Sequence, residues 1–183
     1  MEDLIIDDGN GISIDFLEGL NDNPNFSLLR NSSGFYELSL DTTKNQTIQR
    51  ITGVLLKNGM PLDKPEKIEF KSNLYWWLME GDTIANITYT YINEFTGELS
   101  YVNLPPLINW KDELIPTINS SSYTDSKTGV FNTVIAPIKE MIGDTMKISA
   151  EYNHPITIKN SSSKFLEISE YLSIKDSVLI ILK

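Results

Sequence analysis

This sequence is a regular succession of short apolar runs, each of strand length, with turn-forming residues between them. In Phe35–Leu40 and Lys67–Lys71 apolar residues recur at every second position, which is the pattern of a half-buried strand. The run Ile48–Lys57 stops at Asn58-Gly59, a dipeptide that accepts the positive φ angles of a tight hairpin turn. About ten such runs follow residue 35, and no long segment has the 3.6-residue period of a helix. The pattern predicts an all-β sandwich.

Composition points in the same direction. The chain has 23 isoleucines and only three alanines, and β-branched residues favour strands whereas alanine favours helices. An AT-rich genome would produce a similar bias, so the periodicity carries more weight than these counts.

The charged residues and the missing residue types exclude several classes of protein. Fifteen basic against 25 acidic residues give a net charge of −10, which disfavours nucleic-acid binding through a phosphate-neutralising face. The chain has no cysteine and one histidine, His154, so disulfide scaffolds, thiol nucleophiles and Cys/His zinc sites are excluded. No run reaches the roughly 18 to 20 apolar residues of a transmembrane helix. We therefore expect no cofactor, no nucleic acid and no membrane partner.

Residues 1–34 form a zone of their own. Turn-forming Asp, Asn and Gly cluster at residues 7–11 and 21–25, and too few apolar residues lie between them for an independent core. We expect an N-terminal arm that packs on the main domain or on a neighbouring subunit, and whose deletion leaves the sandwich folded. The acidic start also lacks the basic and apolar regions of a secretory signal. The arm residues expected to bind a partner are Ile5, Ile6, Ile12, Ile14 and Phe16.

Two parts of the sequence carry a family resemblance. Ile51–Leu62 followed by Lys67–Phe70 reads as a strand, an Asn-Gly-x-Pro turn and a second strand, and Tyr123–Val130 with Gly143–Ala150 reads as a Thr-Asp turn and later strands. Together these segments resemble the bacterial immunoglobulin-like domains of the invasin and intimin type over roughly residues 46–152. The resemblance implies a scaffold of the kind found in surface adhesins and tailed-phage virion proteins, and it brings no catalytic residue with it.

The expected architecture is therefore an immunoglobulin-like β-sandwich over residues 35–183, with a long insertion at about 80–120 and extra C-terminal strands. One expanded sandwich and two small domains both remain open. The last run, Val178–Leu182, is apolar on both faces, so we expect both faces to be buried. The predicted core residues are Ile51, Val54, Leu56, Ile68, Phe70, one of Trp76 and Trp77, Ile84, Val134, Ile148, Leu179 and Ile181.

Few residues suggest chemistry. Asp7–Gly11 resembles the start of a calcium loop, but Ile12 and Gly19 stand where further oxygen ligands would be needed, so we expect an acidic turn and no metal site. His154 has neither a second histidine nor a cysteine to complete a metal site, and no nucleophile elbow accompanies it. Trp76 and Trp77 must point to opposite faces of a strand. We expect one in the core and the other at an interface; a sugar-stacking platform is the alternative.

Three functions follow as hypotheses. The first is a non-enzymatic structural subunit of a multi-protein particle, most concretely a tailed-bacteriophage virion (tail, collar or head decoration), that acts through protein–protein contacts and forms a homo-oligomer. The second is a surface adhesin or carbohydrate-binding module located at the cell surface. An enzyme is the third and least expected, because no pair of the many carboxylates is singled out by its context.

Overall fold

The computed structural model describes residues 4–17, 28–84, 88–93, 99–160 and 167–183 of the 183-residue chain. These residues form strands β1–β16 and one short 3₁₀ turn, η1. In chain order the elements are β1 (Leu4–Asp7), β2 (Ile12–Phe16), β3 (Leu29–Arg30), β4 (Tyr36–Leu38), β5 (Gln49–Lys57), β6 (Lys67–Ser72), β7 (Tyr75–Leu78), β8 (Thr83–Ile84), β9 (Thr88–Ile92), β10 (Leu99–Asn103), β11 (Leu107–Ile108), β12 (Glu113–Pro116), β13 (Ser121–Tyr123), β14 (Val130–Ile135), η1 (Lys139–Met141), β15 (Thr145–Asn160) and β16 (Glu167–Leu182).

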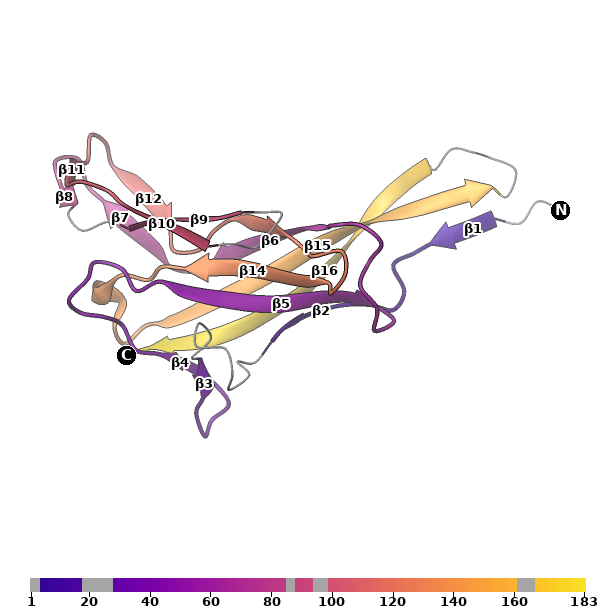
Figure 1. Cartoon of the computed structure of the whole chain (residues 1–183), viewed down its shortest axis with the longest axis horizontal. Coiled ribbons are helices and arrows are strands. Elements are labelled where there is room, and N and C mark those ends of the chain that lie inside the picture. The colour runs from indigo at the N-terminus through magenta and orange to yellow at the C-terminus, as the bar shows by residue number, and fades with distance from the viewer. Residues whose placement is uncertain (1–3, 18–27, 85–87, 94–98, 161–166) are drawn as a thin grey trace.

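The larger sheet is organised around a long antiparallel pair, β15 and β16. Its strand order is β13-β6-β15-β16-β4-β3, and β1 joins it by pairing with the far part of β15. Among the strand pairs of the described residues, only β4 and β16 are parallel. A bulge between Ile156 and Thr157 shifts the β15–β16 register, and the far ends of both strands extend with β1 toward one end of the molecule (Figure 1).

The smaller sheet has the order β14-β5-β2 and is antiparallel. It packs on the larger sheet, and the ring of Phe131, which is fully buried, lies between them. That ring is 5.7 Å from the Phe70 ring of the larger sheet and 6.2 Å from the Phe16 ring of β2 (centroid distances). Isoleucine, leucine and methionine side chains from both sheets complete the core.

Three two-stranded ribbons lie at the other end of the molecule (Figure 1). They are β7–β12, β8–β11 and β9–β10. Except for β7, their strands come from the stretch expected as an insertion, so that stretch is built from strand pairs rather than from irregular loop.

The predicted fold class, an all-β sandwich, is confirmed. The turn at Asn58-Gly59 is also present, with φ angles of 52° and 78°. The hairpin beyond it is short, however, because only Met60 pairs back on Lys57 before the chain crosses to the larger sheet as β6. A strong turn dipeptide fixes the local bend and does not decide which sheet the next strand joins.

The predicted core is correct for Ile51, Ile68, Phe70, Ile84, Val134 and Ile148, which are all buried. In β16, however, the predicted face is wrong, and in β5 the prediction is wrong beyond Ile51. Leu55 is fully buried where Val54 and Leu56 were expected, and both of these are only partly buried. Likewise Ile180 and Leu182 are buried, whereas Leu179 is 39% exposed and Ile181 partly buried. The expectation that Val178–Leu182 is buried on both faces is therefore corrected.

Candidate functional site

The most prominent surface feature is one face of the β7–β12 ribbon. Trp77 lies opposite Leu114, and Tyr75 lies opposite Pro116, so these four side chains share one face of the ribbon. Trp77 is 62% exposed, Leu114 56% and Tyr75 50%. We call this set, Tyr75, Trp77, Leu114 and Pro116, the aromatic face.

The opposite face of the same ribbon points inward. Leu78 is buried, and Trp76 is partly buried and packs against the hydrophobic core. Thr117 is buried just after β12, and its hydroxyl donates to the carbonyl of Leu74, 2.8 Å away, which ties the two strands together. Of the two tryptophans, Trp76 is thus the inner one and Trp77 the outer one, as the alternation predicts.

A buried asparagine organises the turns beyond the ribbon. Asn109 is 5% exposed, and its side-chain amide donates to the carbonyls of Met79 (3.0 Å) and Lys111 (2.6 Å). Its backbone carbonyl also accepts the N–H of Gly81 at 2.8 Å. Nothing in the sequence around Asn109 signals this role, because two of these three partners, Met79 and Gly81, come from a turn some thirty residues earlier.

These turns expose further apolar side chains. Ile108 is 73% exposed and Trp110 is 75% exposed. The ammonium group of Lys111 lies 4.9 Å from the centre of the Trp110 ring, a cation–π contact.

A pocket of about 420 Å³ lies beside Trp76 and Trp77. Adjacent side chains of a strand point to opposite faces, so a pocket that both indoles line must run along an edge of β7. Among the described residues β7 pairs only with β12, which leaves its other edge for this pocket. We call it the indole pocket; it is also lined by Asp82, Ile84, Ile138 and Glu140.

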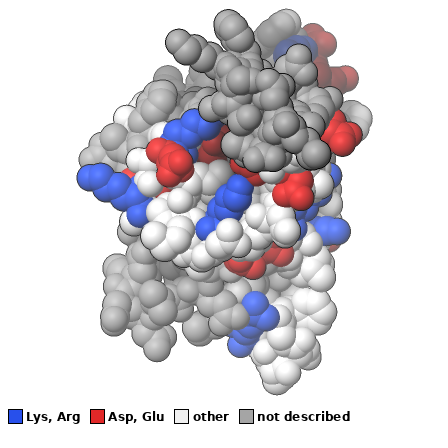
Figure 2. Space-filling model, turned by 90° about the vertical axis from the view of Figure 1, so that its right-hand side faces the viewer, with Lys and Arg blue, Asp and Glu red and all other residues white. Residues whose placement is uncertain are grey.

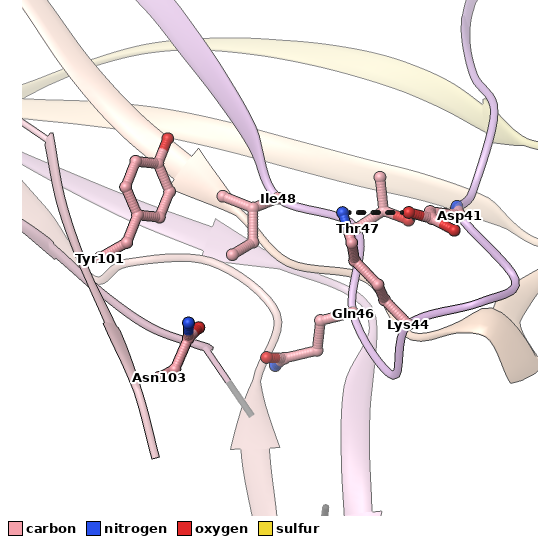
Figure 3. Close-up of a pocket in the computed structure, with 7 residues that line it drawn as sticks. All are labelled: Asp41, Lys44, Gln46, Thr47, Ile48, Tyr101 and Asn103. Atoms are coloured by element: carbon pink, nitrogen blue, oxygen red, sulfur yellow. Dashed lines mark hydrogen bonds and ion pairs between the residues drawn. The ribbon is translucent and has the colours of Figure 1, made fainter. Parts of the chain in front are cut away.

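A second pocket, of about 550 Å³, lies between the segment 41–48 and β10. Figure 3 shows Tyr101 and Asn103 on one side of it and Gln46 and Ile48 on the other. Its charged residues neutralise each other, because Lys44 Nζ lies 3.1 Å from Asp41 Oδ2. The pocket therefore offers mainly neutral polar groups.

A chain of polar contacts joins the N-terminal segment to β15. Oδ1 of Asp7 lies 2.7 Å from Lys57 Nζ and 3.2 Å from Nε2 of His154, and Nδ1 of His154 is 3.3 Å from the Tyr152 hydroxyl. The hydrogen bond from Lys57 holds the pKa of the Asp7 carboxyl below its usual range. Burial, and then the neighbouring Glu66 carboxylate, raise the pKa of the Tyr152 phenol. Through Asp7 the contacts bind the end of β1 to β5 of the smaller sheet and to β15 of the larger sheet.

The part of the molecule that carries this network bears charges of both signs. On the face shown in Figure 2, basic and acidic side chains of the described residues alternate. The described residues of this face therefore form no extended patch of one sign that would attract a highly charged polymer.

Most of the arm residues that were predicted to bind a partner instead make contacts within this chain. Ile14 is 4% exposed in the core, and Ile12 and Phe16 pack against it, because β2 pairs along its whole length with β5. Ile5, in β1, pairs with Lys159 of β15. Ile6, at 58% exposed, is the one of the five whose side chain is shown largely open to a partner. Ile14 is thus corrected to a core residue.

Other site types are missing from the part of the chain that the structure describes. It contains no group of three His, Cys, Asp or Glu side chains placed to hold a metal ion. It also contains no helix long and apolar enough to cross a membrane.

Comparisons with known proteins add little. No family model matches the chain, and no curated protein matches it. Among solved structures, it is similar to the ASH/PapD-like domain 7 of human CEP192, with 8% identity, 94% of this chain and 85% of that chain covered, and a TM-score of 0.27. A similarity of that size supports no conclusion about this protein.

Proposed function

We propose that this protein is a non-enzymatic structural subunit that works through protein–protein contacts, and that the aromatic face is its main contact surface. The supporting observation is the exposure of Trp77, Leu114 and Tyr75 side by side on one ribbon. Large aromatic side chains contribute much area at little cost in conformational entropy, and they are enriched in the centres of interfaces.

The particle that we propose is a tailed-bacteriophage virion, in which this chain is a tail, collar or head-decoration component. The basis is the resemblance of its turn and strand motifs to domains that occur there. Ile6, exposed on β1 at the far end of the molecule, would give such a subunit a second contact point. Two contact points at opposite ends are what a repeating assembly needs.

The direct test is assembly. The full chain is co-expressed with the products of its neighbouring genes, and the molar mass of the complexes is measured by size-exclusion chromatography with light scattering. We expect a stable complex of defined mass. A chain that stays a monodisperse monomer with every neighbour contradicts the proposal.

Carbohydrate binding is the second candidate, in an adhesin or a carbohydrate-binding module at the cell surface. The exposed Trp77 and Tyr75 rings favour it, because aromatic faces also stack on sugar rings. A glycan array decides the matter: binding by the native chain that is lost in Trp77→Ala supports it, and silence on every glycan removes it.

A further inference from the structure

The indole pocket differs from the aromatic face in that it combines aromatic rings with negative charge. Asp82 and Glu140 line it together with Trp76 and Trp77, and among the described residues that line it none is a lysine or arginine. Ile84 and Ile138, each 8% exposed, supply an apolar floor.

The two carboxylates are only weakly neutralised by contacts within the chain. Lys139 Nζ is 3.9 Å from Oε1 of Glu140, and both side chains are largely exposed, so this ion pair is weak and screened by solvent. Oδ2 of Asp82 accepts the backbone N–H of Met79 at 2.9 Å, which fixes the carboxylate in place without adding a formal positive charge.

This combination suits a long cationic side chain. A cation over an indole ring is attracted by the negative face of the π system. A guanidinium group is planar, so it can stack flat on an aromatic ring and donate two parallel hydrogen bonds to a carboxylate. An ammonium group is not planar and has neither of these two contacts available. The methylene groups of the same side chain would lie on the apolar floor.

We propose that the indole pocket receives an arginine side chain of a partner protein, with the guanidinium against Trp77 and its N–H groups directed at Glu140 and Asp82. This inference rests on the proposed function and names the chemistry of the partner at the contact surface. It also agrees with the net charge of −10, which steers the chain toward basic partners.

A second copy of this chain is a poor source of that arginine. The sequence contains two arginines, Arg30 and Arg50. The Arg30 guanidinium already lies 4.7 Å from the centre of the Tyr36 ring, and Arg50 is partly buried in β5.

The test uses a short neutral peptide with one central arginine, and the same peptide with citrulline, which has nearly the same shape and no charge. Binding is followed through the indole N–H signals of ¹⁵N-labelled full-length protein. We expect the arginine peptide to shift the Trp76 and Trp77 signals saturably, and citrulline to shift them far less. Glu140→Gln and Trp77→Leu should each weaken the binding by about three- to tenfold.

Trp110→Leu is the matched control, because Trp110 is exposed but does not line the pocket; its binding should equal that of the native chain. Equal responses to arginine and citrulline, or unchanged binding in Glu140→Gln and Trp77→Leu, overturn the proposal. The assembly experiment separates the two claims. Suppose that the subunit assembles through the aromatic face, and that Glu140→Gln assembles and binds the peptide as the native chain does. The proposal of an arginine pocket is then wrong, and the proposed function stands.

Discussion

The ring of Phe131 in β14 occupies the space above Gly53 in β5, the residue directly opposite it in the smaller sheet. A Cβ atom on residue 53 would come within 2.2 Å of the ring and 2.8 Å of the backbone oxygen of Asp15. Gly53 thus holds a core position whose volume is filled by a side chain from the neighbouring strand. The ring in turn joins the two sheets through its contacts with Phe70 and Phe16.

Replacing Gly53 with alanine should therefore destabilise the sandwich. Overpacking a well-filled core costs about 1 to 3 kcal/mol, and urea unfolding measures it. In the double variant with Phe131→Leu part of the clash disappears. Its loss in free energy of unfolding should therefore be smaller than the sum of the losses of the two single variants. A loss within 0.5 kcal/mol of zero (about the scatter of neutral surface changes) would show that the ring does not sit over Gly53.

The face of β16 can be tested with a matched pair of variants. Ile180→Ala removes a fully buried side chain and should cost about 2 to 5 kcal/mol. Leu179→Ala removes a neighbour that is 39% exposed and should cost clearly less. Chemical denaturation of both variants gives the comparison, and the reverse order would mean that the strand is packed on its other face.

The polar contacts of Asp7 predict an acid-dependent stability. The pKa of this carboxyl is lower in the folded protein than the ordinary 3.8, so the unfolded chain binds the proton more readily. The stabilisation is then present above that value and is lost as the pH falls through the folded pKa. Asp7→Asn should lower the melting temperature at neutral pH.

The gap in melting temperature between the native chain and Asp7→Asn should narrow as the pH falls below about 4. Differential scanning calorimetry from pH 7 to pH 2.5 follows it. Asp8→Asn is the control, because among the described residues the Asp8 carboxylate accepts only the exposed N–H of Asn10. A gap that stays constant with pH would mean that the Asp7 carboxylate is not stabilised by these contacts.

Deleting residues 2–25 should unfold or strongly destabilise the protein, contrary to what the sequence suggests. The deletion removes β2, which pairs with β5 from Ile12 to Phe16, and with it the buried Ile14. Ile14→Ala alone should cost on the order of 2 to 5 kcal/mol. Circular dichroism and thermal unfolding check both; a deleted chain that melts within a few degrees of the native one would support a detachable arm.

The sequence predicts the strands better than it predicts their faces, and Gly53 shows why. In Ile51–Leu56 the inward positions are Ile51, Gly53 and Leu55, and a glycine hides the alternation because its space is filled by Phe131 from elsewhere. Val178–Leu182 is apolar at every position, and its inward face is set by long-range pairing with β15 and β4, which the sequence does not show.

In the candidate site, too, the sequence predicts the local strand pattern but not the long-range contacts. Alternation along β7 predicts that one of Trp76 and Trp77 points outward, and this is confirmed. The partners of that residue could not be predicted, since Leu114 and Pro116 come from β12 and reach the ribbon only by cross-strand pairing. The two pocket carboxylates, on Asp82 and Glu140, come from segments nearly sixty residues apart.

The claim that the aromatic face binds the partner is tested most directly by comparing the assembly of two variants, Trp77→Ser and Tyr171→Ser. The two side chains are 62% and 63% exposed, and Tyr171 lies on β16, outside the β7–β12 ribbon. Each variant is co-expressed with the neighbouring gene products, and the mass of the complexes is measured by light scattering after thermal unfolding has shown that both are folded. We predict that Trp77→Ser elutes as the free chain while Tyr171→Ser assembles like the native protein. Normal assembly of Trp77→Ser would contradict the account.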